Sequence, residues 1–236
     1  MTVAAAKDLA ALGDLGLAAL AARGDAAAAR LIITRHNQRL YRVAWSILKN
    51  PAEAEDALQE AYLKAFAAMG RFSGASALST WLTRIVINEA LGRRRAAERR
   101  RRNLEEGGVT LMEDFRQAAS PSEAQPPDLI AARRDLTRLL EAAIARLPDP
   151  LRIVLVLRDV DEFSAREAAE ALAIPEATVK TRLFRARRRL RADLDPDVRT
   201  ALADTFRFGD RHCKSLTNRV LARLGLEREP LPPAAI

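Results

Sequence analysis

The stretch FSGASALSTWLTRIVINEALGRRRAAERRRR, residues 72–102, organises the rest of this chain. A loop of small and polar residues, 72–77, leads into a pattern that predicts a helix, because large apolar side chains recur at helical spacing. The apolar stripe comprises Trp81, Leu82, Ile85 and Val86. We expect the other face to expose Thr80, Thr83, Arg84, Ile87 and Asn88. The helix then enters a block of seven arginines between Arg93 and Arg102.

Two interpretations fit this stretch. A core helix with a solvated basic tail is the ordinary one, because charge runs usually only face solvent. The order of an aromatic-led loop, a polar helix face and an arginine block favours nucleic acid, because stacking, base-edge contacts and phosphate contacts each need a different kind of group. The sequence therefore predicts a nucleic-acid interface in residues 72–102.

Composition favours an all-α protein that binds a polyanion. Hydrophobic residues make up 49% of the 236 positions, enough for one large or two small domains, and no alternating β-branched run predicts a strand. Alanine, leucine and arginine dominate, and these are strong helix formers. The net charge of +8 and the pI of about 10.4 point to a nucleic acid as the partner.

Several classes of protein are not expected. No apolar run is long enough for membrane insertion, and the interrupted Ala/Leu-rich start does not predict a signal peptide. One cysteine, Cys213, suits a reducing cytoplasm, and two histidines make a metal site improbable, so we expect no cofactor. No glycine-rich phosphate loop or nucleophile–base pair predicts an enzyme.

A first helical module is predicted over residues 26–102. Its first helix spans about 26–49, and Asn50-Pro51 caps and opens a second that runs to Met69. The outer face of that second helix is acidic, with Glu53, Asp56, Gln59 and Glu60. In a basic chain this face is unsuited to DNA, and it serves either solubility or the docking of another protein. Residues 1–25 form an N-terminal extension, and residues 103–127, rich in Gly, Pro and polar residues, predict a flexible linker.

A second module, residues 128–194, predicts a helix-turn-helix. Ser164 and Glu167 match a capping box at the start of a short helix, the turn contains Ala173-Ile174-Pro175, and a basic helix follows to Leu190. The exposed side of that last helix carries Glu176, Thr178, Lys180, Thr181, Arg182, Arg185, Arg188 and Arg189. An ordinary helical hairpin with a basic surface is the alternative, but capping, turn and charge together favour a helix that enters the major groove.

Two segments resemble one known family. DALQEAYLKAFAAMGRFSGASALSTWLTRIVINEALGRRR (56–95) is similar to domain two of bacterial sigma factors of the extracytoplasmic-function (ECF) group, in the sigma-70 family. LPDPLRIVLVLRDVDEFSAREAAEALAIPEATVKTRLFRARRRL (147–190) is similar to their domain four. The resemblance covers roughly residues 26–194, and both motifs occur in the family's order without a third domain between them.

The resemblance implies a transcription initiation factor that binds core RNA polymerase, directs it to promoters and assists DNA opening. It implies docking on the clamp helices of the largest subunit through Glu55, Asp56, Gln59 and Glu60. It implies capture of a flipped minus-ten base by Phe72, Ser73, Gly74, Ala75 and Ser76, with Trp81, Arg84 and Asn88 beneath and beside it. It implies minus-thirty-five recognition by Glu176, Thr178, Lys180, Thr181, Phe184 and Arg185. The polymerase flap and an anti-sigma factor are further implied partners.

Some residues depart from the family's pattern. Ala173 stands where the family often has glycine, so a left-handed turn there would be strained by the Cβ. Ala177 replaces another frequent glycine, and Ser73 and Ala75 make the loop less charged than is usual. The alternative function is a stand-alone helix-turn-helix regulator, which would have no need of the acidic helix or of the loop before Trp81.

The C-terminal extension, residues 195–236, is predicted to contain a helix from Asp210 to Gly225. Its apolar stripe comprises Cys213, Leu216, Val220, Leu221 and Leu224, and so short a helix must pack on something. One possibility is a structural cap on the second module with Cys213 buried. The other is a regulatory latch, in which this helix with Phe206 and Phe208 docks on either module and limits access to polymerase or DNA.

Overall fold

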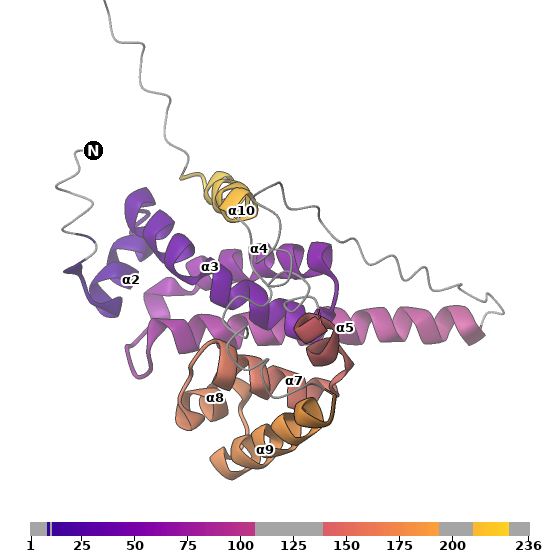
Figure 1. Ribbon diagram of the computed structural model, residues 1–236. Helices are drawn as coiled ribbons and strands as arrows, with labels where there is room; N and C mark the ends of the chain where they lie inside the picture. Colours follow the sequence, from indigo (N-terminus) through magenta and orange to yellow (C-terminus); the bar gives the residue numbers. More distant parts are fainter. Residues whose placement is uncertain (1–8, 10, 107–138, 194–209, 227–236) are drawn as a thin grey trace, which may run out of the picture.

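The computed structural model describes residues 9, 11–106, 139–193 and 210–226, and within these ranges the regular structure is entirely helical (Figure 1). The all-α prediction is therefore confirmed. Helices α2 to α5 form one module and helices α7 to α9 a second, while α10 lies on the far side of the first module from the second. In the described parts of the chain, no helix is both long enough and apolar enough to cross a membrane.

The first module begins with α2 (Asp14–Ala22) and α3 (Ala26–Leu48). Asp25 starts α3 because its carboxylate accepts the N–H of Ala28 at 2.8 Å. Helix α4 (Pro51–Ala67) opens as the sequence predicts: the Asn50 side chain accepts from Ala52 and Glu53, and Pro51 occupies the first turn. A 3₁₀ turn, η1 (Met69–Arg71), follows before the loop that leads into α5.

Helix α5 (Leu78–Glu106) is the element that both modules share, because it packs against α3 and α4 on one side and against α8 on another. It continues four residues beyond the predicted end of the module at Arg102, so the predicted linker starts inside a helix. The rest of that linker, and the start of the predicted second module up to residue 138, lie outside the described residues.

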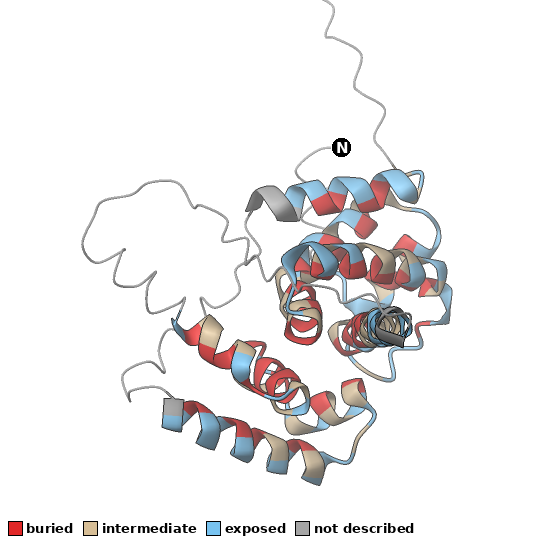
Figure 2. Cartoon of the chain, turned by 90° about the vertical axis from the view of Figure 1, so that its right-hand side faces the viewer, coloured by how far each residue is buried: buried red, intermediate tan, exposed pale blue. Residues whose placement is uncertain are grey.

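The second module contains a helix at residues 139–146, α7 (Asp149–Leu155), η2 (Val156–Val160), α8 (Ala165–Leu172) and α9 (Glu176–Asp193). Helix α7 continues without a break into η2, which is a turn of π-helix. The predicted capping box is present: Ser164 Oγ accepts from Glu167 N at 3.1 Å, and Glu167 Oε2 accepts from Ser164 N at 2.8 Å. Figure 2 shows that the buried sides of these helices face inward and the exposed sides face solvent.

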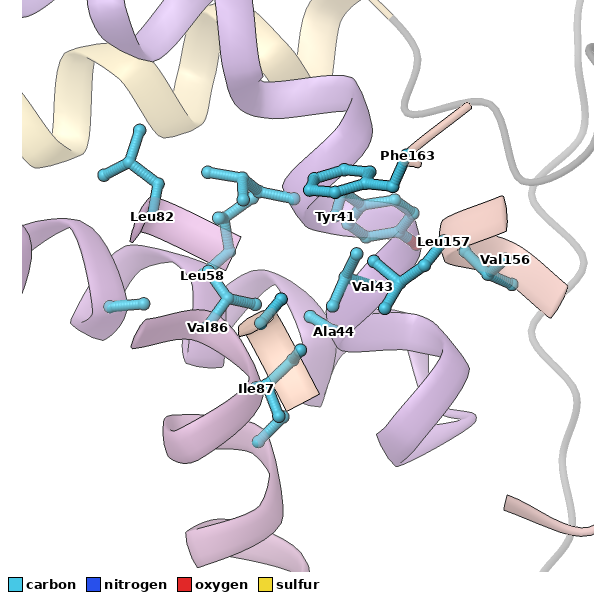
Figure 3. Packing of buried hydrophobic residues seen from close by; sticks show 14 of the residues in the cluster. Tyr41, Val43, Ala44, Leu58, Leu82, Val86, Ile87, Val156, Leu157 and Phe163 are labelled. Atoms are coloured by element: carbon cyan, nitrogen blue, oxygen red, sulfur yellow. The ribbon is translucent and has the colours of Figure 1, made fainter. Parts of the chain in front are cut away.

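One hydrophobic core runs through both modules. Tyr41, Val43 and Leu58 of the first module belong to the same cluster of buried side chains as Val156, Leu157 and Phe163 of the second (Figure 3). Around it, Arg42 of α3 donates to Asp161 at 2.8 Å, and the guanidinium of Arg39 lies 5.0 Å from the ring centre of Phe163. The two modules therefore pack as one body along α3 and α5.

Two expectations about α5 are wrong for the same reason. Thr80, Thr83 and Ile87, expected on an exposed polar face, are buried, while Trp81 and Ile85 of the expected apolar stripe are only partly buried. A helix that packs on several sides buries more than one stripe, and α5 has α3, α4 and α8 around it. The hydroxyl oxygens of Thr80 and Thr83 are buried without a hydrogen-bond partner.

We expect the substitution Ala173→Gly to stabilise the protein. Ala173 ends α8 in the left-handed region at φ 52°, a conformation that is unfavourable for a residue with a Cβ. Removing the Cβ relieves that strain, and after the greater flexibility of glycine in the unfolded chain is subtracted the gain should be about 0.5–1 kcal/mol. Urea denaturation followed by circular dichroism measures it.

The matched control is Ala177→Gly, at the second position where this chain has alanine and the family often has glycine. Ala177 lies in the first turn of α9, and its φ is not positive. The same chemical change should there lower stability by up to about 1 kcal/mol, because glycine is a poor helix former. Equal shifts of the two variants in the same direction would contradict the strain at Ala173.

Candidate functional site

The exposed face of α9 gathers all six residues predicted to read duplex DNA. Thr178 is half-buried and the other five are exposed: Glu176, Lys180, Thr181, Phe184 and Arg185. Val179, Leu183 and Ala186 form the opposite, buried face and hold α9 against α7 and α8. The capped α8 and the tight turn at Ala173 therefore present α9 with its polar, cationic side outward.

Phe184 is the most unusual member of this face. Its side chain is 67% exposed, although a phenyl ring of this size is normally buried. It lies between cations one turn away on each side, Lys180 and Arg188, and next to Arg185. An apolar ring can contact a thymine methyl group while the neighbouring cations contact guanine edges or phosphates. The arrangement is chemically suited to the major groove.

Polar contacts fix several side chains on and beside this face of α9. Lys180 pairs with Glu176 one turn earlier at 2.9 Å, and Thr181 Oγ1 donates to the carbonyl of Ala177 at 2.9 Å. Arg187, on the flank, donates to both carboxylate oxygens of Asp159, and this hydrogen bonding raises the pKa of the guanidinium. Arg187 thereby ties α9 to η2 rather than facing outward freely.

The loop at 72–77 is built differently from the prediction. Phe72, placed in the base-capturing set, is only 9% exposed, with its ring 5.5 Å from that of Trp81. Phe72 therefore supports Trp81 from a buried position and does not itself offer a free ring face to a base. Contacts with a captured base would come from the other residues of the loop. Ser73, Gly74 and Ala75 are exposed, and Ser76 is half-buried. Arg84 and Asn88, about one and two turns after Trp81 on α5, are exposed as predicted.

Helix α2 supports this loop, a role that was not predicted from the sequence. The carboxylate of Asp14 accepts the N–H of Leu78 at 2.7 Å and so satisfies the first turn of α5. Gly74 has φ 73°, and a Cβ there would lie 2.8 Å from Cγ of Leu15. The N-terminal segment is thus part of the loop's structure. The signal in the sequence was the single acidic residue within an Ala/Leu-rich helix.

The four residues of the predicted docking set share the outer face of α4. Asp56 is exposed, and Glu55, Gln59 and Glu60 are half-buried. Toward α5, Arg93 donates to Glu89 at 2.8 Å and lies 3.8 Å from Glu53. Burial would raise the pKa of Glu89, but hydrogen bonds from Lys64 and Arg93 outweigh it and lower the pKa, so this carboxylate stays ionised.

Two of these carboxylates are already paired with α10 (Asp210–Arg223). Arg219 forms an ion pair with Glu55, and Arg223 lies 3.4 Å from Glu60. Helix α10 packs on α3 and α4, so the possibility that it caps the second module is wrong, and its position on the first module is one of the two that a latch would take. Leu216, Val220 and Leu221 of its predicted stripe are buried, while Phe206, Phe208 and the side chain of Cys213 lie outside the described residues.

Between the modules, a cavity of about 290 Å³ opens beside Arg42. It is lined by Arg35, His36, Gln38, Arg39, Arg42, Val160, Asp161 and Glu162. Burial raises the pKa of Asp161 to about 7 in spite of Arg42, and burial together with Arg39 lowers the pKa of His36 to about 4. Within the described residues, no three His, Cys, Asp or Glu side chains are placed to hold a metal ion.

Comparisons with known proteins agree with this geometry. Residues 32–100 match the family model "Sigma-70 region 2", and residues 137–190 match "Sigma-70, region 4". The chain is 32% identical over 181 residues to the RNA polymerase sigma-H factor of Pseudomonas aeruginosa, covering 76% of this chain and 92% of that relative. It is 29% identical over 177 residues to the ECF RNA polymerase sigma-E factor of Escherichia coli K12, covering 75% and 92%.

Two solved structures share the fold at 28% identity. One is described as the structure of CnrH in complex with the cytosolic domain of CnrY, with a TM-score of 0.54 and coverage of 78% of this chain and 98% of that one. The other is the sigma factor RpoE in complex with the anti-sigma factor NepR from Bartonella quintana, with a TM-score of 0.53 and coverage of 71% and 94%.

We expect Gly74→Ala to destabilise the loop and α2 together. The left-handed φ costs about 1–2 kcal/mol for a residue with a Cβ, and the contact with Leu15 adds to it. In the double variant Gly74→Ala/Leu15→Ala the clash disappears but the strain remains, so part of the loss should be recovered. Thermal unfolding measures both, and Gly70→Ala, where a Cβ would meet nothing within 4 Å, is the control. Strictly additive losses in the double variant would contradict the contact.

Proposed function

Because this chain belongs to the sigma-70 family and is a transcription initiation factor of the ECF group, we propose that three separate faces divide its work. The α9 face reads the minus-thirty-five element, the α5 loop captures a minus-ten base, and the acidic α4 face docks on core RNA polymerase. The observation that carries this proposal is the α9 face, where a capped helix-turn-helix holds an exposed phenyl ring among cations. A stand-alone regulator would leave the α4 face without a purpose.

The division of work follows from the chemistry of each face. A duplex element requires a helix in the groove with cations on the phosphates, and α9 offers both. A base in the minus-ten element must first leave its stack, which costs a few kcal/mol, and contacts with the loop and with Trp81, Arg84 and Asn88 can compensate for that cost. These groups hold and orient DNA. The bond-making chemistry belongs to the polymerase, so the chain itself is not an enzyme.

The acidic face supports the polymerase partner through charge. The chain as a whole carries +8, yet α4 presents Glu55, Asp56 and Glu60 on one side. A basic partner surface, such as the clamp helices of the largest subunit, would be attracted to this side and would not compete for the DNA-reading faces. The second module would contact the flap, and an anti-sigma factor would bind the chain in the cytoplasm; among the solved structures of similar fold, RpoE is in complex with the anti-sigma factor NepR.

The proposal is tested by binding to purified core RNA polymerase. Asp56→Arg reverses an exposed charge in the middle of the α4 face, so affinity for the polymerase should fall about tenfold or more while the helical content is unchanged. Biolayer interferometry with immobilised polymerase measures the dissociation constant. Glu170→Arg, an exposed charge reversal on α8, is the matched control. Wild-type affinity in Asp56→Arg would remove this face from the docking site.

A second test concerns DNA. In the polymerase complex, Arg185→Ala should weaken binding to a promoter by about 1–3 kcal/mol and relax the preference at one position of the minus-thirty-five element. Gel-shift titrations on the promoter and on fragments with single changes in that element measure both effects. Arg191→Ala, near the C-terminal end of α9 and also exposed, should weaken binding equally on every sequence if at all. A uniform loss for Arg185→Ala would assign it to phosphate, and no loss would remove it from the interface.

A further inference from the structure

Helix α10 covers part of the face on which the polymerase is proposed to dock. Its apolar side chains Leu216, Val220 and Leu221 are at most 1% exposed. The helix itself lies against α3 and α4 (Figure 1). A 14-residue helix is marginal alone in water, so this packing is what keeps α10 in place.

Polar contacts fix the register of α10 on α3. The amide of Asn37 donates to Thr217 Oγ1 at 3.1 Å in a buried position, and Arg30 donates to Asn218 at 3.3 Å. A buried amide–hydroxyl contact is satisfied in one alignment of the two helices, and sliding α10 by one turn would break it. The helix is therefore seated in a specific position.

The end of α10 is also adapted to this position. Gly225 has φ 67°, and the N–H of Leu226 donates back to the carbonyl of Leu221 at 2.9 Å, which is the hydrogen bond of a Schellman motif. The turn places the partly buried Leu226 against the core beside the α2–α3 connection, where a Cβ on Gly24 would lie 3.8 Å from it. The contact thus extends beyond α10 to the start of the module.

The charges of α10 match those of α4. Arg219 and Arg223, one turn apart, pair with Glu55 and Glu60, whose side chains are 19% and 33% exposed. Exposed ion pairs contribute little to stability, so the apolar side chains hold the helix and the arginines select where it binds. The same two carboxylates belong to the proposed docking set, and α10 neutralises them.

We propose that α10 is an intramolecular competitor of core RNA polymerase, which must leave the α3–α4 surface before the polymerase docks on α4. This inference rests on the proposed docking role of α4. A binding site that is open only in a fraction of molecules has an apparent affinity reduced by that fraction. Weakening α10 should therefore tighten polymerase binding, and fastening it should abolish binding.

The first experiment weakens the contact without altering α4. Arg219→Glu/Arg223→Glu sets like charges opposite Glu55 and Glu60, and the affinity for purified core polymerase should rise about three- to tenfold. Lys214→Glu, an exposed charge reversal on the same helix, should leave the affinity near that of the wild type. Circular dichroism confirms that each variant is folded before binding is measured.

The second experiment fastens α10 reversibly. Arg30→Cys and Asn218→Cys, whose native side chains are in contact, are introduced together with Cys213→Ser and joined by a short, cleavable bismaleimide. The crosslinked protein should bind polymerase at least tenfold more weakly, and cleavage should restore binding. The same protein capped at both thiols with N-ethylmaleimide is the control for bulk at these sites.

The outcomes separate the two proposals. Equal affinity before and after crosslinking overturns the competition, whatever the charge-reversal variant does, while the docking role of α4 stands if Asp56→Arg still weakens binding. If crosslinking abolishes binding and cleavage restores it, the competition holds. If neither the wild type nor the released variants bind polymerase, the docking proposal itself fails, and the competition fails with it.

Discussion

The buried guanidinium of Arg152 is the contact on which the arrangement of the two modules depends. It is wholly enclosed, and it donates to the carbonyls of Ser46, Ala145 and Leu147 and to the carboxylate of Asp149. Ser46 lies in the last turn of α3, where carbonyls have no partner within the helix, so Arg152 completes the end of α3 from the second module. Burial lowers the pKa of Arg152, and the adjacent Asp149 opposes that shift, so the cation is kept.

Through this contact, hydrogen bonds and ion pairs fix the position of the second module in addition to hydrophobic packing. Asp149 also pairs with Arg94 of α5, and Arg42 pairs with Asp161, so ionic contacts join the modules at both ends of the shared core. Thr80 and Thr83 of α5 are buried, whereas α9 and the outer side of α4 expose residues such as Arg185 and Asp56. The fold therefore presents α9, the helix proposed to read DNA, and the acidic face of α4 on different elements, and of these two only α4 is in contact with α10.

The parts of the fold that could be predicted are those that depend on neighbours in sequence. Asn50 and the pair Ser164–Glu167 cap their helices as predicted, because a cap involves residues two or three positions apart. Ala173 keeps the left-handed conformation of the turn although it carries a Cβ, so the departure from glycine noted in the sequence does not change the backbone there. The exposed positions of α9 followed from helical periodicity, since its buried face is a single stripe. The family followed from two motifs that occur in a fixed order.

The amino-acid sequence alone thus determined most of the helices, the caps at Asn50 and Ser164, and the residues of the α9 and α4 faces. Only the tertiary structure decided which faces of α5 are buried, because a helix packed by three neighbours has no single apolar stripe. It likewise decided where α10 lies: an amphipathic stripe shows that a helix must pack, whereas the surface it packs on depends on residues some 160–190 positions away, such as Glu55 and Arg30. Shape and charge that complement each other across such distances in sequence exist only once the chain is folded.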